Sequence, residues 1–113
     1  MNVQSTKQRA FLRYAFVASA EVTEVSSGAK LSARTSELGL GGCYVYTLNP
    51  FAEGALVLLR ILGDQEAFEA KAIVVYCHPG SGMGLAFAGI TADQQSRLEV
   101  WLTELVTQLR LIS

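Results

Sequence analysis

The chain has 113 residues, of which half are apolar and 17% are charged, and its formal net charge is −1. This length predicts one domain spanning residues 1–113 with a single core, and the composition excludes a long disordered segment. The weakly negative charge argues against general binding of DNA or RNA, and no segment reaches the roughly 18 uninterrupted apolar residues of a membrane span. Because residues 1–9 also lack the apolar stretch of a signal peptide, we expect a cytoplasmic protein with no membrane partner.

Residues 1–13 form a basic arm. Residues 1–14 carry Lys7, Arg9 and Arg13 and no acidic residue, a charge of +3, whereas the remainder carries six basic and ten acidic residues, a charge of −4. Positive charge gathered on one terminal segment favours an arm that closes over an anion. An ordinary solvated tail would carry the same charges, so both interpretations stay open.

Residues 14–90 show the short-period patterns of β-strands, separated by turn signals at residues 26–28, 63–64 and 78–82. The predicted strands are residues 14–25, 29–36, 43–47, 55–62, 68–76 and 83–88. Residues 55–62 are apolar on both faces, which predicts a strand buried in a closed or covered sheet. A glycine-dense corner at residues 37–42 separates the second strand from the third.

The hydrophobic period changes to that of a helix after residue 90. Thr91 and Gln94 fit a capping box, in which the Thr hydroxyl binds the amide of the third helical residue and the Gln side chain reaches back. Apolar residues then follow at helical spacing: Leu98, Trp101, Leu102, Leu105, Val106 and Leu109. We therefore predict a mainly β chain, with a six-stranded antiparallel β-barrel over residues 14–90 and a C-terminal helix over residues 91–110 that packs Trp101 into the core.

Two arginines four residues apart, Arg9 and Arg13, stand immediately before the first predicted strand. The arginine fork fits phosphate oxygens bidentately and also fits the O6 and N7 acceptors of guanine. If the segment is turn-like or helical, this spacing places both side chains on one face. Two solvated arginines are the alternative reading, since the same spacing occurs by chance in many chains.

The glycine-dense corner reads Glu37-Leu-Gly39-Leu-Gly41-Gly42. Glycine permits positive φ and close approach of the backbone to a ligand, and successive amides in such a turn can form an anion-binding nest. A tight corner between two strands would demand the same glycines. Tyr44 and Tyr46 alternate on the next strand, so either ring could line a site here, although packing or surface cover is the simpler role.

Other chemistry finds little support in the sequence. No nucleophile, base and acid stand in a recognisable catalytic arrangement, so we expect no enzyme. A lone histidine, His78, and no Cys-x-x-Cys pair speak against a metal site, and His78 is expected to be a solvated turn residue. Cys43 and Cys77 lie in apolar, strand-like stretches and are expected to behave as small buried hydrophobes rather than as a disulfide.

The order and spacing of these motifs resemble the PilZ domain family over nearly the whole chain. Such domains carry an Arg-x-x-x-Arg arm, then a (Asp/Asn)-x-Ser-x-x-Gly motif between two strands, then a barrel. Arg9 and Arg13 match the first motif, and the following strand Gly42-Cys-Tyr-Val45 sets the register of the second. Gly42 then matches the final glycine, Glu37 stands at the Asp/Asn position and Gly39 at the serine position. A rival register through Ser36 and Gly39 would put Arg34 at the Asp/Asn position.

The resemblance implies a bacterial second-messenger receptor that binds cyclic di-GMP (c-di-GMP), with no cofactor. Its ligand-binding residues would be Arg9, Arg13, Glu37, Gly39 and Gly42. The arginines would contact guanine and phosphate, and Glu37 would accept hydrogen bonds from a guanine edge. Because Gly39 lacks a hydroxyl, one polar contact is lost, which should lower the affinity about tenfold or less.

Three functions therefore compete. The first is a c-di-GMP receptor whose arm orders over the ligand and changes the surface offered to a protein partner. The second is a degenerate PilZ-like adaptor that binds a protein and not the nucleotide, as the departures at Glu37 and Gly39 suggest. The third is a different small barrel that binds an oligonucleotide or a flavin. The acidic balance and the sparse exposed aromatics speak against an oligonucleotide, and nothing specific in the sequence supports a flavin.

Overall fold

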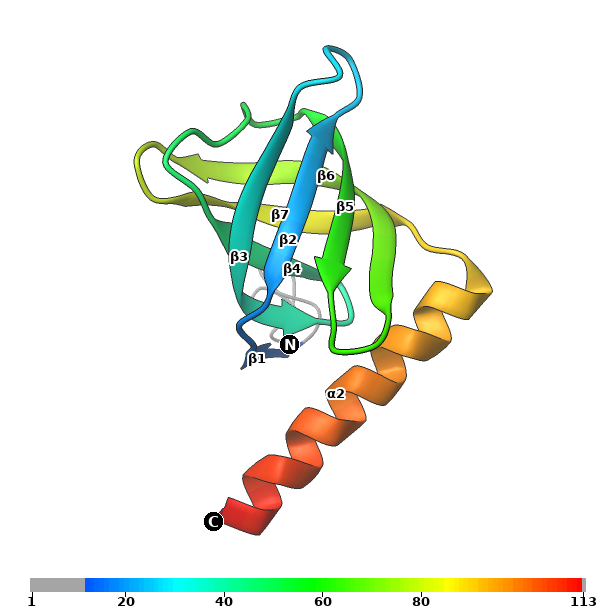
Figure 1. Cartoon of the computed structure of the whole chain (residues 1–113). Coiled ribbons are helices and arrows are strands. Elements are labelled where there is room, and N and C mark those ends of the chain that lie inside the picture. Colours follow the sequence, from blue (N-terminus) through cyan, green and yellow to red (C-terminus); the bar gives the residue numbers. More distant parts are fainter. Residues whose placement is uncertain (1–11, 113) are drawn as a thin grey trace, which may run out of the picture.

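The structure is a computed structural model that describes residues 12–112, with side chains to residue 109. The described range forms seven strands followed by one helix (Figure 1). In chain order the elements are β1 Arg13–Ala15, β2 Ser19–Glu24, β3 Lys30–Gly39, β4 Gly42–Tyr46, β5 Leu56–Leu62, β6 Ala67–His78, β7 Gly82–Gly89 and α2 Ala92–Ile112.

The strands form one antiparallel sheet that closes into a barrel. Its order is β1-β3-β2-β5-β6-β7-β4, and β4 also pairs with β3, so that β2 to β7 make a closed ring of six strands. The predicted six-stranded antiparallel barrel with a C-terminal helix is therefore confirmed. β1 is an additional strand, which pairs with the end of β3 beyond the segment that pairs with β2.

The predicted strand 14–25 is divided in two by a buried threonine. The Thr35 side chain is fully buried, and its hydroxyl donates to the Phe16 carbonyl at 2.6 Å and accepts from the Ala18 amide at 2.9 Å. This hydroxyl takes over hydrogen bonds that a regular ladder would supply, so the chain leaves the sheet between β1 and β2. The sequence pattern alone does not reveal this break.

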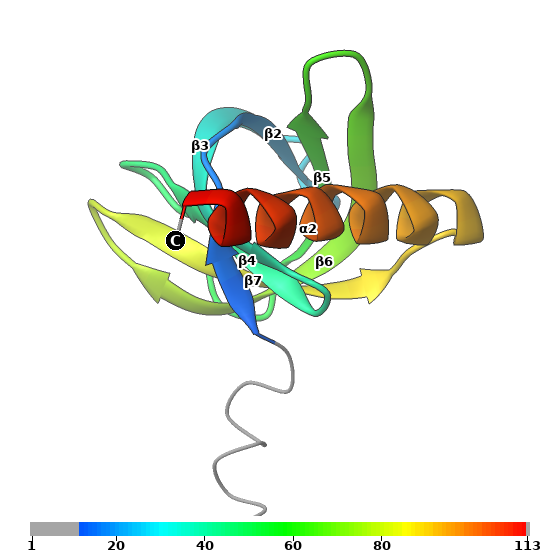
Figure 2. The same ribbon diagram turned by 90° about the horizontal axis from the view of Figure 1, so that it is seen from below.

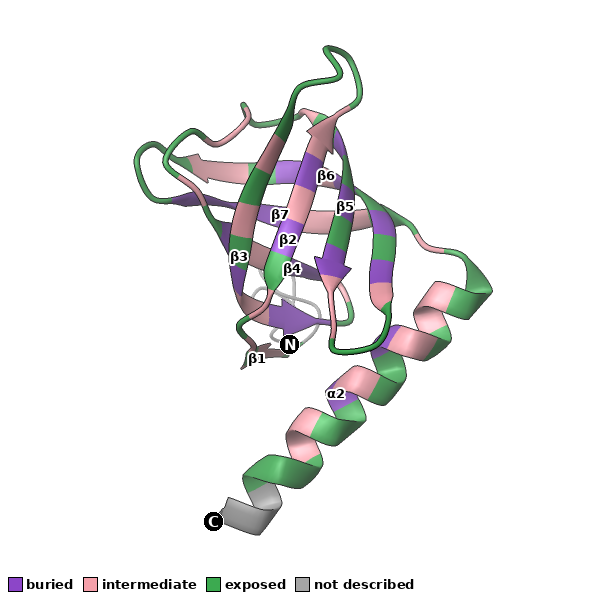
Figure 3. Ribbon diagram, viewed as in Figure 1, coloured by how far each residue is buried: buried purple, intermediate pink, exposed green. Residues whose placement is uncertain are grey.

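The core fills the barrel interior with alternate residues of every strand of the ring (Figure 3). In β5, Val57, Leu59 and Ile61 are buried, whereas Leu56 and Leu58 are 38% and 46% exposed. The strand therefore lies in a closed sheet, as predicted, but only its inward side chains are buried, because the outer face of the barrel is uncovered here. The turn glycines Gly28, Gly54 and Gly80 adopt positive φ, as tight reversals of the chain require.

The helix α2 lies beneath the barrel and crosses its lower end (Figures 1 and 2). Leu98 and Leu102 are buried, and the Trp101 ring packs against Phe16 and Phe68, with centroids 5.7 and 6.2 Å apart. Trp101 is thus a core residue, as predicted. Within the described part of the chain, no helix is both long enough and apolar enough to cross a membrane.

Only half of the predicted capping box forms. The Gln94 amide donates to the Thr91 hydroxyl at 3.3 Å, as expected of an N-cap. The Gln94 side chain does not turn back to the cap, because its Oε1 accepts from the Glu69 amide of β6 at 2.8 Å. This contact fastens the start of the helix to the edge of the barrel.

Candidate ligand-binding face

Pairing of β1 with β3 brings Arg13 to the second motif. Arg13 lies opposite Gly39 and Ala15 lies opposite Glu37, and side chains of opposed residues share one face of a sheet. The Arg13 Nη1 is 3.9 Å from Glu37 Oε1, so the two side chains form an ion pair across the strands. Arg13 lies in a strand rather than in a turn or helix, and its predicted companion Arg9 lies outside the described residues.

The Arg13 guanidinium is unusually placed for a cation. Only 11% of the side chain is exposed, against 45% for Glu37. Its buried Nη1 makes no hydrogen bond with any residue of the described range. Arginine stays charged at every physiological pH, and nearly all buried donors in proteins have an acceptor. Apart from its ion pair with Glu37, this nitrogen can therefore still donate a hydrogen bond to an anionic or carbonyl acceptor.

The glycines of the second motif allow close approach of backbone to backbone. A methyl group on Gly39 would overlap the Leu12 carbonyl oxygen, and one on Gly42 would overlap the Leu85 carbonyl oxygen. Positive φ, which glycine would permit in the corner, occurs at neither residue. Both glycines are therefore explained by the docking of β1 on β3 and of β7 on β4.

An aromatic surface continues from Glu37 across β4, β7 and β6. Glu37 lies opposite Tyr44, Tyr44 opposite Gly84, and Gly84 opposite Tyr76. Tyr44 and Tyr76 are stacked with centroids 6.0 Å apart, and a methyl group on Gly84 would overlap the Tyr76 ring. Glycine in β7 thus lets two rings cover the strand between them, forming a flat apolar floor beside the ion pair.

Sequence reasoning missed Tyr76 and was right about His78 only in part. His78 is exposed, as expected, but it ends β6 rather than lying in the turn, and its Nδ1 is 3.1 Å from the Tyr44 hydroxyl. Its ring is also 5.3 Å from that of Tyr76. The sequence held one hint of this surface, because Gly82 and Gly84 alternate on β7 between two strands that carry aromatic residues. Only the register of the strands shows that the rings of β4 and β6 meet across these glycines.

The hydroxyl and ring contacts join four residues into what we call the ring patch: Tyr44, Tyr46, Tyr76 and His78. Tyr46 is 55% exposed and packs edge-on against Tyr44 at 5.7 Å. The ring patch and the Arg13–Glu37 pair lie next to each other on the outside of the barrel. Flat rings beside a donor and an acceptor suit a planar, hydrogen-bonding ligand such as a nucleobase.

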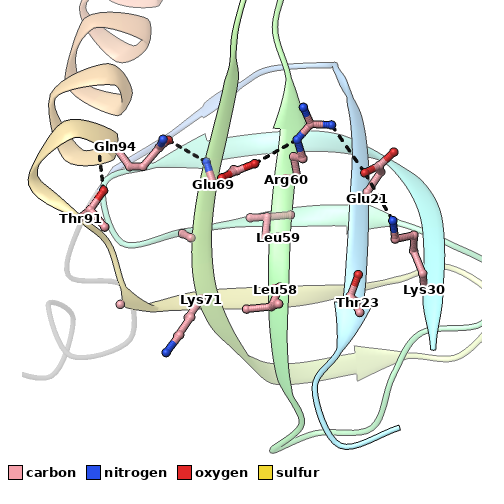
Figure 4. A pocket seen from close by; sticks show the side chains of 12 residues that line it. Glu21, Thr23, Lys30, Leu58, Leu59, Arg60, Glu69, Lys71, Thr91 and Gln94 are labelled. Carbon is pink, nitrogen blue, oxygen red and sulfur yellow. Dashed lines mark hydrogen bonds and ion pairs between the residues drawn. The ribbon is translucent and has the colours of Figure 1, made fainter. Parts of the chain in front are cut away.

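A hollow of about 590 Å³ lies apart from these residues, on the outer face of β2, β5 and β6 (Figure 4). All of its charged side chains except Lys71 are paired with one another: Glu21 lies 4.0 Å from Lys30 and 3.8 Å from Arg60, and Arg60 lies 3.0 Å from Glu69. None of the predicted site residues line it. We regard it as a solvated face of the barrel. Within residues 12–112 no group of three metal-binding side chains occurs.

Solved structures with the same fold include c-di-GMP complexes. The PilZ domain of YcgR from Escherichia coli with c-di-GMP has a TM-score of 0.75 at 16% identity, covering 91% of this chain and 95% of that one. The K. pneumonia MrkH–c-di-GMP complex has a TM-score of 0.76 at 16% identity, covering 93% of this chain and 55% of that one. The PilZ domain of CeSA from a cellulose-synthesizing bacterium has a TM-score of 0.65 at 18% identity, covering 83% and 97%.

Identities this low establish the fold alone, and this chain spans only about half of MrkH. A search of curated proteins by sequence found no match. The family model for the PilZ domain, in contrast, matches residues 7–104, which includes the arm motif, the whole barrel and most of the helix. The chain therefore belongs to the PilZ domain family.

Proposed function

We propose that this chain is a c-di-GMP receptor module that acts by binding and not by catalysis. The observation that carries the proposal is Arg13, a nearly buried guanidinium whose Nη1 has no hydrogen-bond acceptor in the described range and which stands beside Glu37 on the outer face. Membership of the PilZ family supports the ligand class. YcgR and MrkH, two neighbours of the same fold, are described as c-di-GMP complexes.

Each group on the face has a role that suits this ligand. The Arg13 fork can bind a phosphate, or the O6 and N7 atoms of a guanine, in two parallel hydrogen bonds. The half-exposed Glu37 carboxylate can accept from the ring N–H and amino group of guanine. Tyr44 and Tyr76 offer the surface on which the base stacks. Gly39 adds no hydroxyl, so the binding relies on the arginines and the carboxylate.

The arm completes the site in this proposal. Residues 1–14 carry +3, and c-di-GMP carries two phosphate charges, so the arm is attracted to the bound ligand. Arg9 would then contact the ligand from the side opposite the barrel. An arm ordered in this way presents a new surface to a protein partner, which is how the module would signal.

Calorimetric titration with c-di-GMP, with GTP and cyclic di-AMP as controls, tests the proposal. We expect selective binding that Arg9→Ala and Arg13→Ala each abolish without lowering the melting temperature, because each removes a charge-assisted contact. Arg60→Ala is the matched control, since it removes an exposed arginine from the solvated hollow on β5. Tryptic cleavage after Lys7 and Arg9 should slow when the ligand is added. Unchanged c-di-GMP binding by both Arg9→Ala and Arg13→Ala would show that the ligand-binding site has been assigned wrongly.

The adaptor function remains the second candidate, and one observation favours it. The Leu12 carbonyl oxygen fills the space in which a serine at position 39 would carry its side chain, so the chain around β1 packs directly on the second motif. Exposed Leu12 and Val17, 75% and 64% exposed, flank this strand. A stoichiometric protein complex that does not respond to c-di-GMP, together with no heat in the titration, would establish the adaptor instead.

The prediction of no DNA or RNA binding rests on the charge of the chain alone. MrkH is described as a c-di-GMP-dependent transcription regulatory factor, so membership of this fold does not decide the point. A mobility-shift assay with and without c-di-GMP tests it directly.

A further inference from the structure

A β-bulge turns a third arginine onto the ligand-binding face. The pairing of β3 with β4 runs from Arg34 opposite Tyr46 to Glu37 opposite Tyr44, and the register shifts between Thr35 and Glu37. In a regular strand, residues three apart point to opposite faces. The extra residue in β3 makes Arg34 and Glu37 consecutive outward positions, about 7 Å apart along the strand by the usual rise per residue.

Glu37 therefore lies between two arginines. Arg13 flanks it on one side, at Gly39, and Arg34 flanks it on the other, at Tyr46. Arg34 is exposed and forms no ion pair with a residue of the described range. Lys30 of the same strand and Arg60 of β5 are each paired with a carboxylate, whereas Arg34, like Lys71 of β6, is not paired within the described residues. An unpaired arginine beside an exposed tyrosine ring can bind a further planar group, because the arginine donates hydrogen bonds to its edge and the ring covers its face.

The barrel is also hollowed beside Arg34. Arg34 and Tyr46 are the last pair between β3 and β4, and beyond them the two segments diverge. A shallow, open pocket of about 640 Å³ lies at this point, lined by Arg34, Tyr46, Leu31, Leu48, Ser32 and Asn49 among others. Its lining offers a cation, an exposed ring and small polar groups to a ligand that lies on the surface.

We propose that Arg34, Tyr46 and this pocket form a subsite for a second guanine base, an inference that rests on the proposed function. The Arg34 fork would donate to the O6 and N7 atoms of the base while the Tyr46 ring covers one face. Tyr46 contacts Tyr44 edge-on, so the subsite is continuous with the ring patch. The base comes either from the second half of the same c-di-GMP molecule or from a second molecule.

The subsite can be tested by comparing the affinities for c-di-GMP, which has two guanines, and for cyclic GMP–AMP, which has one. Adenine presents an amino donor where guanine presents O6, so the arginine fork cannot bind it in the same way. We expect Arg34→Ala to weaken c-di-GMP binding about tenfold or more, the usual worth of one such bidentate contact. It should also remove most of the preference of the wild-type protein for c-di-GMP over cyclic GMP–AMP. Arg34→Lys should lose nearly as much of the affinity and of the preference as Arg34→Ala, because an ammonium lacks the planar fork of arginine.

Calorimetric stoichiometry distinguishes the two sources of the base. A loss of affinity at unchanged stoichiometry assigns the subsite to the second half of one ligand, and a fall from two bound molecules to one assigns it to a second molecule. The subsite is overturned if Arg34→Ala matches Arg60→Ala in affinity, stoichiometry and selectivity while the wild-type protein binds. If the wild-type protein binds no c-di-GMP, the proposed function has failed and the subsite fails with it.

Discussion

At the level of single residues, the charge of Arg13 also affects a side chain in the core. Cys43, on the next strand but one, is fully buried, and burial raises the pKa of its thiol from 9.0 to about 12, a rise that the nearby Arg13 charge partly opposes. Cys43 and Cys77 are both free thiols, and Cys77 is only half-buried. The two cysteines should therefore differ sharply in reactivity, since the thiolate is the reactive form.

We predict that iodoacetamide at pH 8 modifies Cys77 and not Cys43 in the folded protein, as read by peptide mass spectrometry, and modifies both in denaturant. The folded pKa of Cys43 lies above its unfolded value, so its contribution to stability is complete below about pH 9 and is lost as the pH rises toward 12. Cys43→Ala should lessen the fall in stability over this window. Equal labelling of the two thiols in the folded protein would contradict the burial of Cys43.

At the scale of elements, α2 is attached to the barrel by a few strong contacts near its start. Leu98 is fully buried, Trp101 lies between two phenylalanines, and Gln94 is bonded to the Glu69 amide of β6. Val100, on the opposite side of the helix from Leu98, and Leu109, near the end of the described side chains, are each 54% exposed. The stability of the helix therefore depends on its first three turns, where its apolar stripe meets the barrel (Figure 3).

Leu98→Ala should lower the free energy of unfolding by about 2 to 5 kcal/mol, because it removes buried atoms and leaves a cavity. Val100→Ala on the opposite side of the same turn should change it by less than about 0.5 kcal/mol. Urea unfolding of both variants against the wild-type protein measures the difference. Equal effects of the two substitutions would mean that the helix does not pack as described.

At the scale of the whole molecule, closure of the sheet joins every element to one core. β3 pairs with β4 on one edge and with β2 and β1 on the other, so segments far apart in the chain depend on each other. The ring contacts of Trp101 with Phe16 and Phe68 extend that core to the helix. Small single domains with one shared core usually unfold in one cooperative step.

Unfolding in urea should accordingly give coincident transitions by far-ultraviolet circular dichroism, which reports the barrel and helix together, and by Trp101 fluorescence, which reports their contact. The tryptophan is the only one in the chain, so its signal needs no deconvolution. A fluorescence transition at clearly lower urea than the dichroism transition would show that the helix leaves the barrel first.

Local patterns were sufficient to predict the elements and to name part of the candidate site. Alternation of apolar residues predicted the strands and helical spacing predicted α2, because these signals depend on neighbours within a few positions of the chain. Glu37, Gly39 and Gly42 were found through motif order, and the structure brings Glu37 and Gly39 to Arg13. The split between β1 and β2, the half-formed capping box and the exposed face of β5 were not predicted.

The order of the residues along the chain was therefore enough to predict the class of fold, the family resemblance and the residue types available for binding. Which of those residues share a face became known only from the three-dimensional arrangement of the strands. The bulge in β3 reverses the side to which Arg34 points, and strand register brings Tyr76 and His78 across β7 to Tyr44. Register and bulges are set by packing between segments far apart in the chain, so no local pattern reveals them.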